Sequence, residues 1–207
     1  MLTASQKHVD YISEFLARSN LSETSEVVDI FHAVRRIPYG SSGGRSAEAV
    51  VENNEGSCSG KHILLKEVLR RLNQVAFVET VRGDFASKIP ALETMPDKLK
   101  RMCEEGRVTD FHQYVVWNSL NGALKLDATW SDGPIKYGLS GNQTWAGNCD
   151  TKLALFPTEV LNRVDDVPSY KAKLLAGLSD CDRQRRFDFL KLLTAWVAKT
   201  ETEGTAE

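Results

Sequence analysis

The sequence predicts an α+β domain, because helical patterns come first along the chain and strand patterns follow. Apolar residues recur at helical spacing within residues 5–36 and again within 58–73. β-branched and aromatic residues then dominate residues 74–85 and 110–130, as is typical of strands. A last amphipathic pattern covers residues 182–199. Helices and strands that are segregated along the chain in this way are typical of α+β folds.

Length and composition predict one domain. The chain has 207 residues, of which 42% are apolar and 26% charged, as in ordinary globular proteins with a sizeable core. We expect a single domain over residues 1–200, with a core of about residues 35–155 and helical extensions at both ends. Residues 201–207 are expected to be a flexible tail.

The charge balance gives no reason to expect nucleic acid or a membrane as a partner. There are 26 basic and 28 acidic residues, which gives a net charge of −2. The arginine-rich segments 35–36, 70–71 and 183–186 are interpreted as solvated helix faces. No apolar stretch approaches the roughly 20 residues that span a bilayer. Residues 1–20 lack the basic and apolar regions of a secretory signal.

The cysteines predict free thiols in a reducing cytoplasm. The four cysteines are far apart in the chain and form no Cys-x-x-Cys pair, which argues against a disulfide scaffold and a structural zinc site. No cofactor is indicated. The cysteines are Cys58, Cys103, Cys149 and Cys181.

The elements are expected in the following order. Residues 5–19 and 24–36 predict two helices, whose apolar positions are Val9, Ile12, Phe15 and Leu16, and Val27, Ile30, Phe31 and Val34. "IPYGSSGGRS" breaks the chain, and "VVENNEGS" is expected to be a polar approach to a third helix at 58–73. The remaining elements are a strand at 74–85, an excursion at 84–108 with a short helix at 96–105, strands at 110–117 and 123–130, an ordered loop at 131–150, a strand at 151–157 and a helix at 182–199.

Cys58 opens the third helix on the side that must be buried. Leu65, Leu69 and Leu72 all lie within roughly 40° of the direction of Cys58 at about 100° per residue. Packing this stripe against the strands therefore aims the sulfur at them. Gly56 allows close backbone approach, and Ser57 can act as the N-cap.

The start of a helix also suits a reactive cysteine. The first-turn amides and the positive helix end favour a thiolate and lower the pKa of Cys58. The N–H of Cys58 itself could stabilise an oxyanion. An inert buried cysteine is the alternative that the helix by itself leaves open.

His112 and Asp127 supply a base and its orienting group. The strands that carry them are joined by "NSLNG", and a four-residue loop over 118–121 would place the two residues directly opposite each other on one face. Asp127 could then accept from one imidazole nitrogen and leave the other for a thiol. A five-residue loop would separate the two side chains onto opposite faces.

The segments "GSCSGKH", "DFHQYVVW" and "LDATW" resemble the transglutaminase-like superfamily, over roughly residues 35–155. The resemblance implies that Cys58 is the nucleophile, His112 the general base and acid, and Asp127 the orienter. It implies a papain-like fold, in which the helix bearing the cysteine packs on an antiparallel sheet. The stand-alone bacterial members of the superfamily are the most similar type.

The resemblance also implies the chemistry. Members of the superfamily transfer an acyl group from an amide or peptide bond through a cysteine thioester, either to water, as an amidase or protease does, or to an amine. The substrate would be a protein, a peptide or a small amide. The calcium sites of animal transglutaminases have no counterpart here, so no metal is implied. A non-catalytic binding module with the same fold is the alternative.

Other residues have competing interpretations. His62 lies one turn after Cys58 and is interpreted as a satisfied buried histidine, while a zinc site of Cys58, His62, His112 and Asp127 is the alternative. His8 and His32 are expected to be structural or surface residues. The side chain of Tyr39 either packs or donates to an oxyanion, and Trp130 or Trp145 could form the wall of an acyl-binding cleft. The other cysteines are expected to be ordinary thiols, although Cys149 could approach the site.

Overall fold

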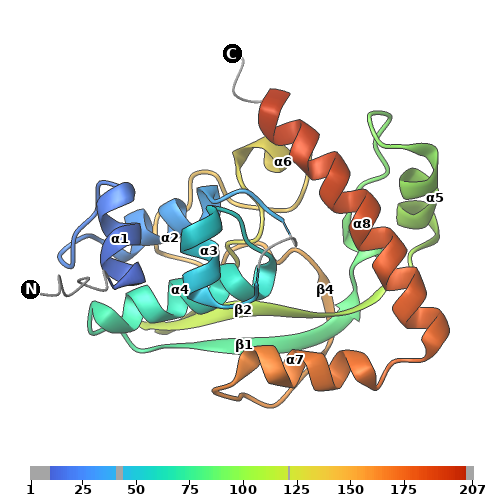
Figure 1. Cartoon of the computed structure of the whole chain (residues 1–207). Helices are drawn as coiled ribbons and strands as arrows, with labels where there is room; N and C mark the ends of the chain where they lie inside the picture. The colour runs from blue at the N-terminus through green and yellow to red at the C-terminus, as the bar shows by residue number, and fades with distance from the viewer. Residues whose placement is uncertain (1–9, 41–43, 121, 204–207) are drawn as a thin grey trace, which may run out of the picture.

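The computed structural model describes residues 10–40, 44–120 and 122–203 (Figure 1). Within them, eight α-helices accompany a four-stranded antiparallel sheet of order β3-β2-β1-β4, which confirms the α+β class. The strands are β1 (Ala76–Asp84), β2 (Thr109–Ser119), β3 (Gly122–Leu126) and β4 (Phe156–Val160). No helix in this described part is long and apolar enough to cross a membrane.

Four helices from the first part of the chain form a layer that packs against the sheet through α4. They are α1 (Tyr11–Arg18), α2 (Val27–Arg36), α3 (Ala47–Asn53) and α4 (Cys58–Arg71). Figure 1 shows α4 lying along β2, and α4 contacts both central strands. The predicted apolar stripe is buried here, with Leu65 and Leu69 fully enclosed and Leu72 partly so.

The later helices surround the other parts of the sheet. They are the 3₁₀ turn η1 (Ala86–Lys88), α5 (Asp97–Glu105), α6 (Asp132–Lys136), α7 (Val167–Ala176) and α8 (Asp180–Glu203). Figure 1 shows α5 and α8 side by side at one end of the sheet, while α7 contacts α4 and β2. Alternate residues of β2 enter two hydrophobic clusters: Val115 packs in the one below α4, and Tyr114 and Val116 pack in the one that includes α5 and α8.

Several predicted elements are confirmed and several boundaries are wrong. The helices α1, α2, α4, α5 and α8 and the strands β1 and β2 lie within or near their predicted ranges. Residues 47–53, in part predicted as a polar approach, form α3, because Ser46 Oγ accepts from the N–H of Ala49 and caps the helix. The predicted loop at 131–150 contains α6, and the strand predicted at 151–157 lies at 156–160. The helix α8 continues to Glu203, so it ends four residues later than predicted and includes residues 201–203, which were expected to be part of the tail.

Two of the predicted residues, His8 and Val9, lie in residues 1–9, which are outside the described part of the chain, as are residues 204–207.

The prediction that Arg35 is solvated is wrong. Arg35 is only 1% exposed and forms an ion pair with Asp132 (Nη2 to Oδ1, 2.7 Å). The short-range sequence pattern could not show this pairing, because Asp132 lies 97 positions further along the chain.

The predicted register of the β2–β3 hairpin is wrong by two residues. Ser119 pairs with Gly122 and Val115 pairs with Leu126, so two residues, not four, separate the strands. Asp127 therefore follows the end of β3 and is not directly opposite His112. A shift of two residues preserves the face of every side chain, because the side-chain period of a strand is two. For this reason His112 and Asp127 still lie on one side and can meet.

Candidate active site

Cys58 is the first residue of α4 and is almost fully enclosed, with 4% of its surface exposed. The chain enters the helix through Gly56, which bridges Tyr39. A Cβ atom at position 56 would lie 2.8 Å from Val50 Cγ2, so the predicted need for glycine is confirmed. Ser57 occupies the N-cap position, but its hydroxyl makes no capping bond, and this part of the prediction is wrong.

The structure brings the imidazole of His112 and the carboxylate of Asp127 together. His112 Nε2 lies 2.6 Å from Asp127 Oδ2, and both side chains are 1% exposed. Asp127 also accepts the backbone N–H groups of Thr129 (3.0 Å) and Ala154 (2.8 Å). Burial by itself would raise the pKa of Asp127, but the charge and hydrogen bond of His112 outweigh it and hold the pKa well below its usual value. Asp127 is therefore a fixed anion that orients the ring.

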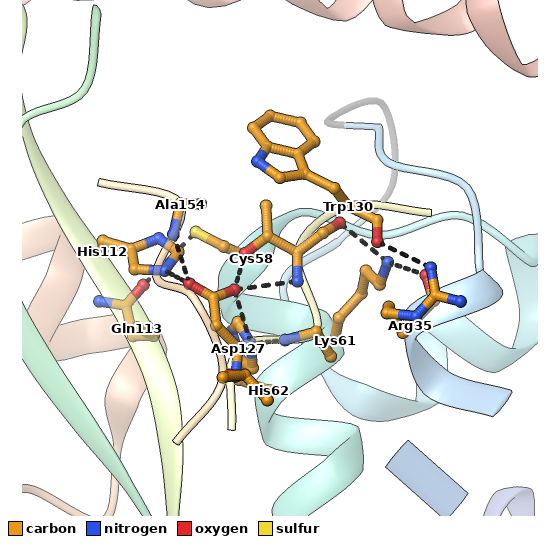
Figure 2. A network of polar contacts seen from close by, with 12 residues as sticks. Arg35, Cys58, Lys61, His62, His112, Gln113, Asp127, Trp130 and Ala154 are labelled. Atoms are coloured by element: carbon orange, nitrogen blue, oxygen red, sulfur yellow. Dashed lines mark hydrogen bonds and ion pairs between the residues drawn. The ribbon is translucent and has the colours of Figure 1, made fainter. Parts of the chain in front are cut away.

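Cys58 and His112 form the second contact of this set. Since Nε2 of His112 bonds to Asp127, Nδ1 is the nitrogen that remains for the thiol, and Figure 2 shows the ring beside both the sulfur and the carboxylate. Burial would lower the pKa of His112, but Asp127 and then Cys58 raise it to about 10. The three residues singled out in the sequence are thus adjacent in space.

Lys171, from α7, is a fourth member of the site that the sequence did not indicate. Its Nζ lies 3.6 Å from Cys58 Sγ and donates to Gln113 Oε1 at 3.2 Å, and the residue is 3% exposed. Burial would raise the pKa of the Cys58 thiol, but the Lys171 ammonium and the His112 imidazole lower it to about 5. The lowered pKa of Cys58 and the raised pKa of His112 together favour a thiolate and an imidazolium at neutral pH.

Asp110 and Arg186 form an ion pair next to Lys171. Asp110 Oδ1 accepts from Arg186 Nε at 2.7 Å and lies 4.0 Å from Lys171 Nζ. Asp110 is 3% exposed, and burial would raise its pKa, but Lys171 and Arg186 hold the pKa below its usual value. Arg186 therefore belongs to the site, and its prediction as part of a solvated face is wrong.

Cys58 opens onto a cavity of about 580 Å³ between the start of α4 and one face of α8. Tyr39, Ser57, Asp110 and Lys171 line it near the sulfur. Burial, followed by the negative charges of Cys58 and Asp110, raises the pKa of Tyr39 well above its usual value. Its hydroxyl is consequently a permanent donor at physiological pH. A cavity of this volume lies in the range of pockets that hold small ligands.

Comparisons of the chain with protein-family models, with curated proteins and with solved structures found no match. The resemblance to the transglutaminase-like superfamily therefore stays a prediction. The chemical roles of Cys58, His112 and Asp127 depend on their own geometry and electrostatics.

The competing interpretations have the following outcomes. His62 is fully buried, and its Nε2 accepts from the N–H of Ala128 at 2.7 Å, while its Nδ1 has no partner among the described residues. It is therefore buried but only half satisfied. Within the same residues no three His, Cys, Asp or Glu side chains are placed to hold a metal ion, and Asp127 instead bonds to His112.

The remaining candidates do not line the cavity. The ring of Trp130 packs on Tyr39 with centroids 4.7 Å apart, and that of Trp145 packs on Phe31, also at 4.7 Å. Neither tryptophan lines the cavity at Cys58, so their prediction as its wall is wrong. His32 Nε2 pairs with the carbonyl of Trp145 (2.9 Å), which is a structural role. Cys149 is exposed and does not line the cavity.

Lys61 joins the three segments that carry the site. Its side chain is fully buried, and its Nζ donates to the carbonyls of Arg35 (2.9 Å), Ile37 (2.7 Å) and Thr129 (3.0 Å). Figure 2 shows this lysine reaching from α4 toward Arg35 and Trp130. The three carbonyls match the three protons of an ammonium group. Lys61 therefore ties α4 to the segment that leads to Tyr39 and to the segment that follows Asp127.

Replacement of Lys61 by Met is expected to lower the free energy of unfolding by about 2–4 kcal/mol, because three buried carbonyls lose their donor. Burial lowers the pKa of Lys61 to about 7, so the measurement is made at pH 6, where the ammonium form predominates. Urea unfolding followed by circular dichroism measures this change. Lys66→Met is the matched control on the same helix. The Lys66 side chain is partly exposed and pairs with Glu67, so its replacement should cost less than about 1 kcal/mol. Equal losses for the two variants would contradict the role assigned to Lys61.

Proposed function

We propose that this protein is a cysteine-dependent acyl-transfer enzyme with a papain-like active site of the transglutaminase-like type. It acts on an amide or peptide bond through a thioester on Cys58 and releases the acyl group to water. The observation that supports this most is the position of the Cys58 sulfur, which lines a cavity of about 580 Å³ while its imidazole partner is held by Asp127 at 2.6 Å. An inert buried cysteine would need neither an adjacent cavity nor an imidazole that is held by a carboxylate.

In the first step the Cys58 thiolate attacks the carbonyl carbon of the amide. A C–S bond forms, and the carbonyl oxygen takes the negative charge. The N–H of Cys58 and the hydroxyl of Tyr39, which lines the same cavity, are the donors that we assign to this oxyanion. The His112 imidazolium then gives its Nδ1 proton to the amide nitrogen, the C–N bond breaks, and an amine leaves. The acyl group remains on Cys58 as a thioester.

In the second step His112, now neutral, takes a proton from water as the water oxygen attacks the thioester. The C–S bond breaks, the carboxylic acid leaves, and the thiolate and the imidazolium are restored. An amine in place of water gives a new amide, so the same residues can support transamidation. Asp127 keeps the ring oriented and stabilises its positive charge in both steps.

The test is the reactivity of Cys58 at mildly acidic pH. Iodoacetamide at pH 6 should label Cys58 rapidly, because most ordinary thiols are protonated at this pH and react slowly. Cys58→Ala should abolish this labelling, and mass spectrometry after incubation with cell extract should detect an acyl adduct on Cys58. Labelling that persists at the wild-type rate in Cys58→Ala would identify a different reactive cysteine. Saturable binding of amides without product would favour the non-catalytic binding module.

The role of Tyr39 predicts a separate effect. Tyr39→Phe keeps the ring and its packing on Trp130 but removes one oxyanion donor. We expect acylation by 4-nitrophenyl acetate to slow by about 10- to 100-fold. The rate of alkylation by iodoacetamide should stay within about twofold of wild type, because alkylation forms no oxyanion. A parallel loss of both rates would assign Tyr39 to packing alone.

A further inference from the structure

A second face of helix α8 lines the cavity. Its core face is formed by Phe189, Leu193, Trp196 and Val197, all of which are buried. A different stripe of the same helix lines the cavity, at spacings of three and four residues. This stripe consists of Phe187, Leu190, Lys191, Thr194, Ala195 and Ala198.

Four of the six residues of the cavity stripe are apolar, and the stripe is incompletely covered. Phe187 is 60% exposed, and Ala195 and Ala198 are also exposed. Two hydroxyls on the cavity wall, Ser57 Oγ and Thr194 Oγ1, are buried and have no hydrogen-bond partner among the described residues. Apolar surface with a few unpartnered polar groups is typical of a ligand site. The stripe therefore suits the apolar part of an acyl donor whose carbonyl lies at Cys58.

The charges on the cavity wall are unbalanced. Lys171 and Arg186 are offset by the Cys58 thiolate and by Asp110, as described above. Arg45 and Lys191 also line the cavity, are exposed, and form no ion pair within 4 Å with any described residue. Asp188, whose carboxylate interacts with Lys191 electrostatically, does not line the cavity. They add two positive charges to the wall of a cavity in a chain whose net charge is −2. This local excess attracts an anionic ligand.

From these features we infer that the acyl donor is an ω-carboxyacyl amide, in which a short apolar segment separates the scissile carbonyl from a carboxylate. The apolar segment lies along the α8 stripe, and the carboxylate meets Arg45 and Lys191. This inference rests on the proposed function, because it assumes that the scissile carbonyl is attacked by Cys58.

Two reagents that differ only in charge test the inference without requiring turnover. They are 6-(iodoacetamido)hexanoate and 6-(iodoacetamido)hexanamide, which have the same reactive group and chain. At pH 6 and low salt, the anionic reagent should alkylate Cys58 about four- to tenfold faster. The ratio should fall roughly two- to threefold in Arg45→Ser and in Lys191→Ser, and approach one in the double variant. Lys199→Ser, which removes an exposed charge of α8 outside the cavity, should keep the wild-type ratio.

A second arm tests the apolar stripe. Phe187→Ser should slow both reagents by the same factor and leave their ratio unchanged. A wild-type ratio near one, or a ratio that the double variant does not change, would overturn the anionic substrate while rapid labelling by the neutral reagent leaves the proposed function intact. If neither reagent labels Cys58 faster than an ordinary thiol, the proposed function fails, and the inference fails with it.

Discussion

Replacement of Lys171 by Met is expected to shift the pH profile of Cys58 alkylation toward alkaline pH by about one to three units. The ammonium lies 3.6 Å from the sulfur and is the largest favourable influence on a thiol whose pKa is about 5. The thiol is ionised above its pKa, so raising the pKa depletes the thiolate at pH 6. The alkylation rate at that pH should fall by up to about 100-fold. A time course of labelling, quenched at intervals and analysed by mass spectrometry, measures this rate.

Two further variants show whether the effect comes from charge. Lys171→Arg keeps a positive charge near the sulfur and should restore most of the low-pH reactivity. Lys173→Met removes an exposed lysine from the same helix and should leave the profile unchanged. If Lys171→Met lowers thermal stability but leaves the pH profile where it is, Lys171 has a packing role only.

Replacement of Asp127 by Asn is expected to lower turnover by about 10³- to 10⁴-fold. The carboxylate is the main cause of the raised pKa of His112, about 10, because it stabilises the imidazolium through a 2.6 Å hydrogen bond. An amide carries no charge and can donate to Nε2, which would place the remaining ring proton toward the thiol. A neutral ring that already holds its proton on Nδ1 cannot take up the proton of the Cys58 thiol. The thiolate–imidazolium pair from which the reaction starts would therefore not form.

The sign of the accompanying titration follows from the same contact. Because the folded-state pKa of His112 is raised, loss of Asp127 should bring it down, and the imidazolium should deprotonate at lower pH. Nuclear magnetic resonance of labelled histidine measures this shift independently of any substrate. Asp150→Asn, a change of an exposed carboxylate that accepts the N–H of Lys125, is the control. An unchanged titration of His112 in Asp127→Asn would remove Asp127 from its assigned role.

The local patterns of the sequence were sufficient for most of the elements around the site. The helix that begins at Cys58 and the strand that carries His112 were predicted because each has one buried face, and the period of its apolar residues reveals that face. The hairpin was predicted with the wrong loop length. The error of two residues did not affect the prediction that His112 and Asp127 can meet, because a shift of two residues leaves both side chains on the same face.

Short elements were missed for a physical reason. The helices α3 and α6 have seven and five residues, too few for a clear hydrophobic period. The helix α3 is set by its cap at Ser46 and by a left-handed residue, Asn54, with φ of 47°. Such short helices are stabilised by their ends and their packing more than by their own pattern.

By itself the sequence determined the order of helices and strands, the place of Cys58 at a helix start, and the pairing of His112 with Asp127 on one face. Only the tertiary structure decided which charges surround the sulfur. Lys171 lies 113 positions from Cys58, and Arg186 lies 76 positions from Asp110. A lysine or arginine in a helix has the same local pattern whether it is solvated or buried beside a partner. Its role is therefore set by the distant segment that packs against it, which no local period reveals.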